Sequence, residues 1–337
     1  MTVEGVPRLP TLVDVARLAQ VAPSTASRAL HGSPRISEAT TERVRAAARG
    51  LGYQPNRLAR SLRTQSTPFV GIVVPDIGIG FYSRFVKGAQ DALEAAGQQV
   101  LVMNTEREAT RETAAMRTLA EHRVRGVLLA TSAGALDDSS APTVYFDHIV
   151  PGRGVGSVAQ ANEQGMTLLV EHLAVHGHRR IGYIGGPPTF TSGLERLAGF
   201  REGVRRLGLD PSHAYVEIGD SVWSPESGAA ATQRLLALAE PPTAIVTSGD
   251  TLALGAMSAC RAAGLRLPAD MALVSFDDPA FGELLDPPVT ALKRCDAEMG
   301  ALAARLLLTA LETGAEGPPT EMRLPMELLA RRSCGCP

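Results

Sequence analysis

The sequence has 337 residues, of which 45% are hydrophobic, and it carries a formal net charge of −2. A chain of this length can bury about two or three cores, so a single domain is not expected. No stretch approaches the ~20 apolar residues of a membrane span, and the N-terminus lacks the charged-then-apolar pattern of a signal peptide. We therefore expect a cytoplasmic protein with no membrane partner.

The charge is distributed unevenly along the chain. Residues 1–67 contain ten arginines and four acidic residues, hence a charge of +6, and the remainder must then carry −8. A basic segment attached to an acidic body is typical of a phosphate-binding module joined to a domain with another task.

Residues 10–63 show the pattern of a small helical domain. Thr11 can cap a first helix, whose apolar residues recur at three- and four-residue spacing. After a short break, Pro23 suits the start of a second helix, and Ser37 can cap a third over residues 38–51. Two short helices joined by a tight turn, the second rich in Ser, Thr and Arg, are the layout of a helix-turn-helix DNA-binding domain.

Beyond residue 68, apolar runs alternate with helical patterns. Strands are expected at residues 70–75, 99–103, 126–130, 143–146, 181–184, 214–218, 244–247, 272–275 and 322–329. Helices are expected at residues 82–96, 111–121, 161–175, 194–207, 227–239, 251–263 and 298–312. Apolar strands separated by helices predict parallel sheets covered on both faces, here in two α/β halves.

Three motifs of the N-terminal segment point to a known family. They are T-L-x-D-V-A-x-x-A-x-V from Thr11, P-S-T-x-S-R-x-L from Pro23 and G-Y-x-P-N-x-x-A-x-x-L from Gly52. The pattern resembles the lac repressor (LacI/GalR) family of transcriptional regulators. The resemblance implies an N-terminal all-α helix-turn-helix head and an α/β periplasmic-binding-protein-like body of two doubly wound subdomains. It also implies about three chain crossings between the subdomains and a ligand in the cleft between them.

The resemblance sets the expected domain boundaries. A helix-turn-helix domain is expected at residues 10–66, with a hinge helix at 56–63, and an effector-binding and dimerisation domain at 68–337. The first subdomain would comprise about 68–160 plus 292–320, and the second about 161–290 plus 321–330. The C-terminal end has no apolar heptads, so a homodimer is expected rather than a tetramer.

Two positions of the turn depart from the family pattern. Gln20 stands where the family usually has glycine, so a strained or altered backbone is expected there. Ala22 stands where the family usually has serine, so the second helix loses its N-cap oxygen and a phosphate contact. We expect the fold to survive and the DNA affinity to fall somewhat.

The resemblance also implies the DNA contacts. Ser24 and Arg28 are expected to contact bases or phosphates, and the residues that would position the DNA backbone are Thr11, Thr25, Ser27 and Asn56. Segment 56–63 resembles the family's hinge helix, in which Leu62 would open a minor-groove step with Ala59 packed beside it. An ordinary basic linker is the alternative for this segment.

Several side chains could bind an effector at the carboxyl ends of strands, where ligands of open α/β sheets collect. Asp76, Asp147, Asp250 and Asp277 each follow an expected strand and could accept hydrogen bonds from sugar hydroxyls. Asp250 could instead cap the next helix. Phe81 could pack against the apolar face of a sugar or belong to the core.

Two further residues match family ligand positions. Arg196 matches the ligand-binding arginine at the start of a helix, where its planar guanidinium can bind paired oxygens. The alternative is a surface ion pair with Glu195 or Glu202. Trp223, the only tryptophan, matches a position that lines the sugar pocket in some relatives, with structural packing as the alternative.

The sequence predicts neither an enzyme nor a metal protein. It has no G-x-S-x-G elbow and no phosphate loop ending in Gly-Lys-Ser/Thr, so no catalysis and no cofactor are expected. His172, His176 and His178 are closely spaced, but they match an ordinary helix-to-strand connection of the family. Cys334 and Cys336 have no second cysteine pair nearby in the sequence, so we expect no metal.

These observations lead to one main hypothesis. The protein would be a ligand-responsive transcriptional regulator, a repressor, that binds near-palindromic operator DNA as a dimer and a sugar-like effector between its subdomains. The alternative is a solute-binding protein of a transporter, against which the basic head argues. A third interpretation is an architectural DNA-binding protein whose body only dimerises.

Overall fold

The computed structural model describes residues 10–53, 67–131, 141–186, 190–219, 223–314 and 318–336. The chain divides into two compact units, residues 1–67 and 68–337, which we call the head and the body. The expected hinge helix, with Asn56, Ala59 and Leu62, lies outside the described residues.

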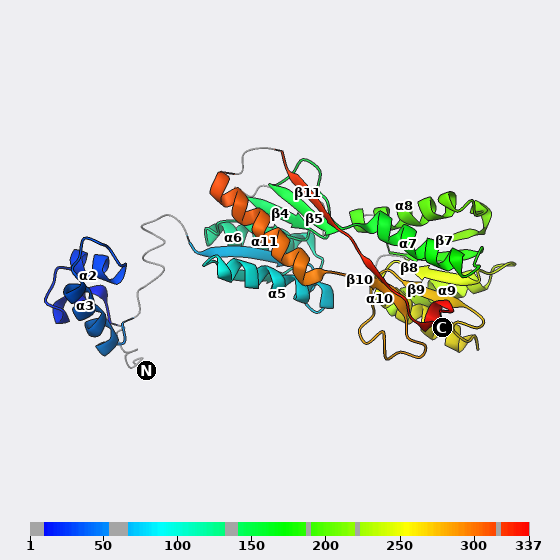
Figure 1. Cartoon of the computed structure of the whole chain (residues 1–337), viewed down its shortest axis with the longest axis horizontal. Coiled ribbons are helices and arrows are strands. Elements are labelled where there is room, and N and C mark those ends of the chain that lie inside the picture. The colour runs from blue at the N-terminus through cyan, green and yellow to red at the C-terminus, as the bar shows by residue number, and fades with distance from the viewer. Residues whose placement is uncertain are drawn as a thin grey trace, which may run out of the picture. The chain divides into compact units, whose positions relative to one another are not determined.

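The described residues of the head form three helices: α1 (Leu12–Leu18), α2 (Pro23–Leu30) and α3 (Glu38–Gly50) (Figure 1). Thr11 begins α1 with a capping box, because its hydroxyl accepts from the backbone N–H of Asp14 and the Asp14 carboxylate accepts from the backbone N–H of Thr11. The core of the head consists of small side chains, namely Val15, Ala16, Ala19, Ala26, Ala29, Val44, Ala47 and Ala48. These small residues let three short helices pack closely.

Both expected departures are visible in the turn between α1 and α2. Gln20 has a φ of 54°, in the left-handed region that favours glycine. Ala22 is the N-cap of α2 and offers no side-chain hydrogen bond, whereas Ser37 at the N-cap of α3 accepts from the backbone N–H of Thr40. The helix-turn-helix therefore forms despite a less favourable turn and cap.

The strands described in the body form two six-stranded sheets (Figure 1). The first has the order β11-β5-β4-β3-β1-β2 and the second the order β12-β10-β9-β8-β6-β7. The first sheet comprises β1 (Phe69–Val74), β2 (Gln99–Asn104), β3 (Val127–Leu129), β4 (Thr143–Phe146), β5 (Gly156–Gln160) and β11 (Thr320–Leu324). The second comprises β6 (Ile181–Gly185), β7 (Ala214–Ile218), β8 (Ala244–Thr247), β9 (Ala272–Ser275), β10 (Thr290–Lys293) and β12 (Glu327–Leu329). The described pairings are parallel except for β10 with β12.

Helices cover both faces of each sheet, as predicted. The first sheet packs against α5 (Gly80–Ala95) and α11 (Asp296–Thr313) on one face and α6 (Ala109–Glu121) on the other. The second packs against α7 (Asn162–Val175) and α8 (Thr191–Arg206) on one face, and α9 (Pro225–Leu236) and α10 (Asp250–Ala262) on the other. Two short 3-10 helices, η1 (Pro211–His213) and η2 (Arg332–Cys334), complete the described elements. Within the described part of the chain, no helix has the length and apolar character needed to span a bilayer.

The connections between the sheets differ in detail from the expected boundaries. The chain passes from one sheet to the other after β5, after β10 and after β11. The expected strand 322–329 is two strands, because β11 pairs with β5 of the first sheet and β12 with β10 of the second. Residues 320–324 therefore belong with the first subdomain, and residues 290–293 with the second.

Two strands, β5 and β10, were not predicted at all. β5 is fully buried although it contains Gly156, Ser157 and Gln160, and β10 is only four residues long. Neither segment shows a long apolar run, so their strand character comes from pairing with neighbours rather than from local pattern.

Candidate functional site

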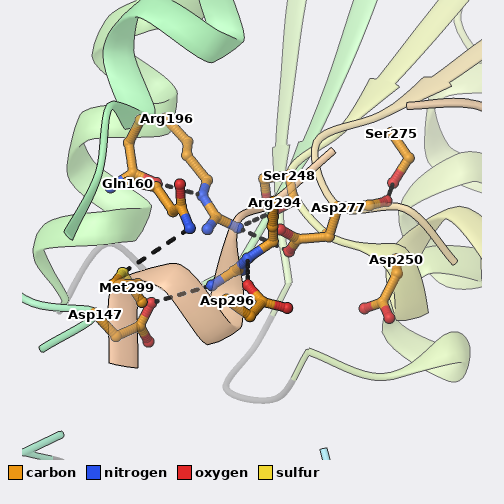
Figure 2. A network of polar contacts seen from close by, with 12 residues as sticks. Asp147, Gln160, Arg196, Ser248, Asp250, Ser275, Asp277, Arg294, Asp296 and Met299 are labelled. Carbon is orange, nitrogen blue, oxygen red and sulfur yellow. Dashed lines mark hydrogen bonds and ion pairs between the residues drawn. The ribbon is translucent and has the colours of Figure 1, made fainter. Parts of the chain in front are cut away.

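A network of charged side chains lies between the two sheets of the body, at the carboxyl ends of their strands (Figure 2). Arg294, directly after β10, donates to Asp277 Oδ1 at 2.7 Å and to Asp296 Oδ1 at 3.0 Å. Its Nη2 lies 3.7 Å from Oδ1 of Asp147, which directly follows β4 of the other sheet. Arg294 thus joins carboxylates that come from both halves of the body.

Arg196, on α8, reaches the same network. Its Nη1 donates to Asp277 Oδ2 at 3.2 Å and to the backbone carbonyl of Ser248, and its Nε donates to Asn162 Oδ1 at 3.0 Å. The Arg196 side chain is 4% exposed. Two buried guanidinium groups therefore share the two oxygens of Asp277, which fixes the orientation of that carboxylate.

Aromatic rings lie against both arginines. The guanidinium carbon of Arg294 is 3.8 Å from the ring centroid of Phe81, and that of Arg196 is 3.9 Å from Phe276 and 5.2 Å from Trp223. These contacts hold each guanidinium over an apolar face while its N–H groups point to the carboxylates. The site thus combines fixed polar groups with aromatic surfaces.

The charges of the network set its protonation state. Burial raises the pKa of Asp277, but Arg294 and Arg196 lower it more, so the pKa lies below its ordinary value and the carboxylate stays ionised. Burial and the charge of Asp277 raise the pKa of Asp250. Burial lowers the pKa of Arg294, but Asp277, Asp296 and Asp147 raise it more, so the guanidinium stays charged.

Asp147 is held by groups of the first subdomain. Its φ is 65°, in the left-handed region, and its Oδ2 accepts a hydrogen bond from the hydroxyl of Tyr82 at 3.1 Å. Burial, followed by the Asp147 charge, raises the pKa of Tyr82 well above its usual value. The neighbouring His148 stacks on Phe190 at 5.1 Å, and burial lowers its pKa. Asp147 is therefore presented to the site by a strained backbone and a neutral, buried shell.

Some buried polar atoms of this region have no hydrogen-bond partner among the described residues. They are Gln160 Oε1, Arg294 Nη2 and His148 Nδ1. Gln160 is 1% exposed, and its Nε2 faces the sulfur of Met299 at 3.9 Å. Buried polar groups in proteins are normally satisfied, so these atoms mark a place where the hydroxyl groups of a bound molecule would find partners.

The head presents a second candidate site on α2. Ser24 and Arg28 are exposed, and Thr25 and Ser27 are half-buried. Thr11 is half-buried, and its hydroxyl donates to Asp14 at 2.6 Å within the capping box. The face of α2 that carries Ser24 and Arg28 is thus open, as the second helix of a helix-turn-helix must be to enter a DNA groove.

Comparisons with known proteins identify the family. Residues 11–56 match the family model "Bacterial regulatory proteins, lacI family", and residues 170–334 match the "Periplasmic binding protein-like domain". The chain is 36% identical to the HTH-type transcriptional regulator CelR of Thermobifida fusca, over 97% of this chain and 98% of CelR. The chain belongs to the lacI family. It is also 33% identical to the ribose operon repressor of Escherichia coli (strain K12), over 88% of this chain and 92% of the repressor.

Solved structures of lacI-family proteins agree with this assignment. The chain is similar to the lac repressor dimer bound to operator and the anti-inducer ONPF, with a TM-score of 0.86 and 29% identity, over 97% of this chain and 99% of that one. It is also similar to the CelR–cellobiose complex, with a TM-score of 0.72 and 34% identity, over 96% and 99%. The predicted fold is confirmed, and the chain is a DNA-binding transcriptional regulator rather than a transporter's solute-binding protein. The named relatives are regulators, not enzymes.

The structure brings most of the expected effector residues of this lacI-family protein together. Phe81, Asp147, Arg196 and Asp277 belong to the network, and Trp223 lies beside Arg196. The surface ion pair that was the alternative for Arg196 is not formed, whereas its effector contact stays a prediction. Glu195 instead binds Arg323 at 2.7 Å and Asn162 at 2.8 Å, and Glu202 binds Arg205 and Arg206.

Two expected residues are held by local contacts. Asp250 is the first residue of α10 and not its N-cap, which is Gly249, so the capping alternative is wrong. Its Oδ1 accepts from the backbone N–H of Thr251 at 2.8 Å. Asp76 Oδ1 accepts from the backbone N–H of Gly78 at 2.9 Å. Among the described residues, neither carboxylate bonds to Arg196 or Arg294, so the role of Asp76 and Asp250 in effector binding remains a prediction.

Sequence reasoning missed Arg294, Asp296 and Gln160. Arg294 and Gln160 lie at the ends of β10 and β5, the two strands that were not predicted. Had those strands been recognised, the rule that selected Asp147 and Asp277 would have selected these residues too. Asp296 begins α11 beside Arg294, and no signal in the sequence indicated that it would be buried.

Proposed function

We propose that the protein is a cytoplasmic repressor that binds near-palindromic operator DNA as a homodimer and is switched by a sugar or sugar-like effector at the buried network. The observation that carries the effector proposal is the convergence of both subdomains on Arg294. Asp147 comes from the first sheet, Asp277 and Arg196 from the second subdomain, and polar atoms without partners lie beside them.

The chemistry of the network suits a polyhydroxylated ligand. Carboxylates accept hydrogen bonds from hydroxyl groups, and guanidinium groups donate to hydroxyl and ring oxygens. The half-buried ring of Trp223 offers a face for the C–H groups of a sugar ring, whereas the ring of Phe81 is buried beneath Arg294. One relative was solved with cellobiose and another is a ribose operon repressor, so these two sugars are the first probes.

DNA binding is assigned to the head. Ser24 and Arg28 on the exposed face of α2 would contact base edges or phosphates, and Thr11, Thr25 and Ser27 would position the DNA backbone. Asn56, Ala59 and Leu62 would act in the hinge, by resemblance alone. The similarity to a lac repressor dimer bound to operator supports this assignment.

The homodimer is supported by exposed apolar side chains on the second subdomain. Phe281 is 77% exposed and Leu284 is 75% exposed, far more than large apolar residues usually are. A two-fold axis would present two heads to two half-sites of the operator. Light scattering of the purified protein measures its oligomeric state, and a monomer at micromolar concentration would contradict the dimer.

The switch follows from a ligand that contacts both subdomains. An effector held by Asp147 on one side and by Arg196 on the other favours one arrangement of the subdomains, and thereby one arrangement of the two heads. The coupling is reciprocal, because an effector that changes the DNA affinity by some factor has its own affinity changed by the same factor.

The test has two parts. Genomic fragments selected by the full-length protein at low salt give the operator, and fluorescence anisotropy then measures its affinity with and without cellobiose, ribose and a wider sugar panel. Retention of no fragment would contradict DNA binding. Operator affinity unchanged by every sugar, with no sugar raising the Tm, would contradict the effector assignment.

The site is tested by substitution. Asp277→Asn should abolish the sugar-induced Tm shift, because an NH2 group, which donates, replaces one of the two oxygens that accept hydrogen bonds from the arginines. Asp210→Asn is the matched control, since this exposed carboxylate accepts hydrogen bonds from Ser212 of its own turn and from no other described residue. Equal sugar affinity in both variants would remove Asp277 from the site.

A further inference from the structure

A second cluster of reactive side chains lies at the C-terminal end of the body, and neither the DNA site nor the effector site uses it. His172 lies in the last turn of α7, and His176 is the C-cap of the same helix. Residues four positions apart project from one face of a helix, so both imidazoles point in the same direction. Cys334 ends η2, and Cys336 follows after Gly335, whose φ of 92° turns the chain back.

The four side chains converge on one point. Their ligand atoms all lie within 4.8 Å of one another. Nε2 of His172 is 3.2 Å from Cys334 Sγ and 3.5 Å from Cys336 Sγ, and Nε2 of His176 is 3.2 Å from Cys336 Sγ. The two sulfur atoms are 2.9 Å apart. Groups separated by about 160 residues in the sequence therefore form a single cluster.

These distances suit a tetrahedral metal. Zinc bonds of about 2.3 Å to sulfur and about 2.0–2.1 Å to nitrogen place the four ligand atoms about 3.3–3.8 Å from one another. The three nitrogen–sulfur distances given above already lie within about 0.4 Å of that geometry, and the two sulfur atoms would separate by about 0.9 Å. The remaining pairs, which lie within 4.8 Å, would come closer by at most about 1.5 Å. Two thiolates and two imidazoles are also a complete set for a structural zinc site, which leaves no open position for a substrate.

The surroundings support a metal rather than a disulfide. A disulfide between Cys334 and Cys336 would leave both imidazoles facing oxidised sulfur, whereas a metal uses all four groups. The hydroxyl of Thr290 donates to Cys334 Sγ at 3.1 Å, which is the outer contact that orients a thiolate ligand. His178 does not join the cluster, because its Nδ1 lies 2.9 Å from the hydroxyl of Thr243.

We propose that His172, His176, Cys334 and Cys336 bind one zinc ion, which fastens the end of the chain to α7. The C-terminal segment that carries the two cysteines already forms hydrogen bonds with the second sheet. The hydroxyl of Ser333 donates to the backbone carbonyl of Leu273 in β9 at 2.6 Å and accepts from the backbone N–H of Thr290 in β10 at 2.8 Å. The zinc site therefore stabilises β9 and β10, the strands that lead to Asp277 and Arg294, whichever effector binds there.

Metal content is the first test. Full-length protein is loaded with zinc in the presence of a reductant and passed through gel filtration, and its metal is measured by mass spectrometry. The wild type should retain about one zinc per chain, and the double variant C334S/C336S less than about a tenth of that. Cys295→Ser and His213→Ala are the controls, since these residues lie outside the cluster, and both should retain the wild-type amount. Wild-type protein that retains no more zinc than the double variant overturns the proposal.

A second measurement needs no variant and so cannot fail through misfolding. Metal-free wild-type protein is titrated with Co²⁺, which should produce a thiolate-to-cobalt charge-transfer band and the visible bands of a tetrahedral ion at about one equivalent. Alkylation followed by peptide mass spectrometry should find the half-buried Cys336 protected by zinc and Cys295 reacting equally with and without it, whereas Cys334 is already buried and does not report on the metal. No thiolate band, or equal alkylation with and without zinc, overturns the site. A Cys334–Cys336 disulfide with no zinc uptake after reduction also overturns it.

The effect of the metal on the Tm of the protein is the third test. Because zinc binds the folded chain, its removal by a chelator should lower the Tm of the wild type by at least about 5 °C. His176→Ala should show a smaller chelator effect, and its exposed position makes unfolding by the substitution itself unexpected. A wild-type Tm that does not respond to chelator, in protein shown to contain zinc, would refute the fastening role.

Discussion

The head and the body use arginine in opposite ways. In the head, Arg17, Arg28 and Arg45 are exposed, and Arg17 makes only a surface ion pair with Asp14. In the body, the side chains of Arg196 and Arg294 are 4% and 9% exposed and bind carboxylates. Exposed guanidinium groups suit phosphates, whose attraction is screened by salt, whereas buried ones have a fixed geometry and are screened little. The same residue type is thus placed in two different environments, exposed in the head and buried among carboxylates in the body.

The cores of the two units differ as much as their charges. The head packs alanine and valine, while the body packs large rings such as Phe85 and Phe146, stacked with centroids 3.6 Å apart. A small unit buries a smaller share of its surface and has less stability to lose. Substitutions at caps and turns should therefore matter most in the head, and substitutions of buried charges most in the body.

The largest effect is expected for Arg196→Ala. The change leaves Asp277 with Arg294 alone and removes the donors to Asn162 and Ser248, so the unfolding free energy of the body should fall by about 3–5 kcal/mol. Trp223 is the only tryptophan and lies in the body, so its fluorescence during urea denaturation reports the body selectively.

Arg205→Ala is the matched control for this variant. Arg205 lies on the same helix and also binds a carboxylate, that of Glu202, but in solvent. The control should unfold almost as the wild type does, because an exposed ion pair is screened and flexible. If both variants lost stability equally, burial would not be what distinguishes the arginines of the body.

The next largest effect is expected for Arg28→Ala, in the head. Losing this exposed side chain should weaken operator binding by about 10–100-fold, the ~1–3 kcal/mol of one specific contact, while the unfolding curve of the body stays unchanged. Anisotropy titrations at several salt concentrations separate two roles. A phosphate contact would lower the salt slope by about 1 and weaken all DNA equally, whereas a base contact would weaken only the operator. Unchanged affinity for every DNA would remove Arg28 from the interface.

Local pattern was enough to predict the head and most of the body. The caps at Thr11 and Ser37 and the apolar spacing between them define the helices, since these signals involve neighbours in the sequence. Continuous apolar runs predicted the central strands for the same reason. β5 and β10 could not be found this way, because their partners, and not their own residues, make them strands.

From the residues alone, the carboxylates of the candidate site were predictable only where they followed a predicted strand, whereas Arg196 was selected through the family resemblance. Asp147 and Asp277 were selected because they follow apolar runs, and Arg294 was missed because β10 was missed. The cluster of His172 with Cys334 was also missed, because the two residues are 162 positions apart and meet only through the folding of the tail against α7. Tertiary proximity of this kind leaves no periodic signal in one sequence.

A smaller effect is expected from the two caps of the head. Ser37→Ala should destabilise α3 by about 1 kcal/mol, because its hydroxyl accepts from the Thr40 N–H. Ala22→Ser should stabilise α2 by about the same amount, because that cap lacks a side-chain acceptor. Hydrogen exchange of the full chain, read on peptides of α2 and α3, measures both, with body peptides as the internal control. No gain for Ala22→Ser would show that the turn at Gln20 limits the start of α2.

The smallest effect is a pH dependence confined to the body. Burial lowers the pKa of His148 below 6.5, its value in the unfolded chain. The charge of Arg196 also lowers this pKa, whereas the charge of Asp147 raises it. Below pH 6.5 the unfolded state therefore binds a proton more readily than the folded state, so stability is lost as the pH falls from 6.5 towards the folded pKa. The pKa of Asp277 is lowered from 3.8, so its protonation affects the stability only below pH 3.8, outside this window. His148→Gln should therefore reduce the decline in the stability of the body between pH 7 and 5, measured by Trp223 fluorescence, while the lowered pKa of His178 preserves part of it. Loss of stacking on Phe190 should lower the whole curve. If stability declined with pH equally in the variant and the wild type, His148 would not be the group that titrates. As a control, hydrogen exchange in the head should be the same in both proteins at each pH.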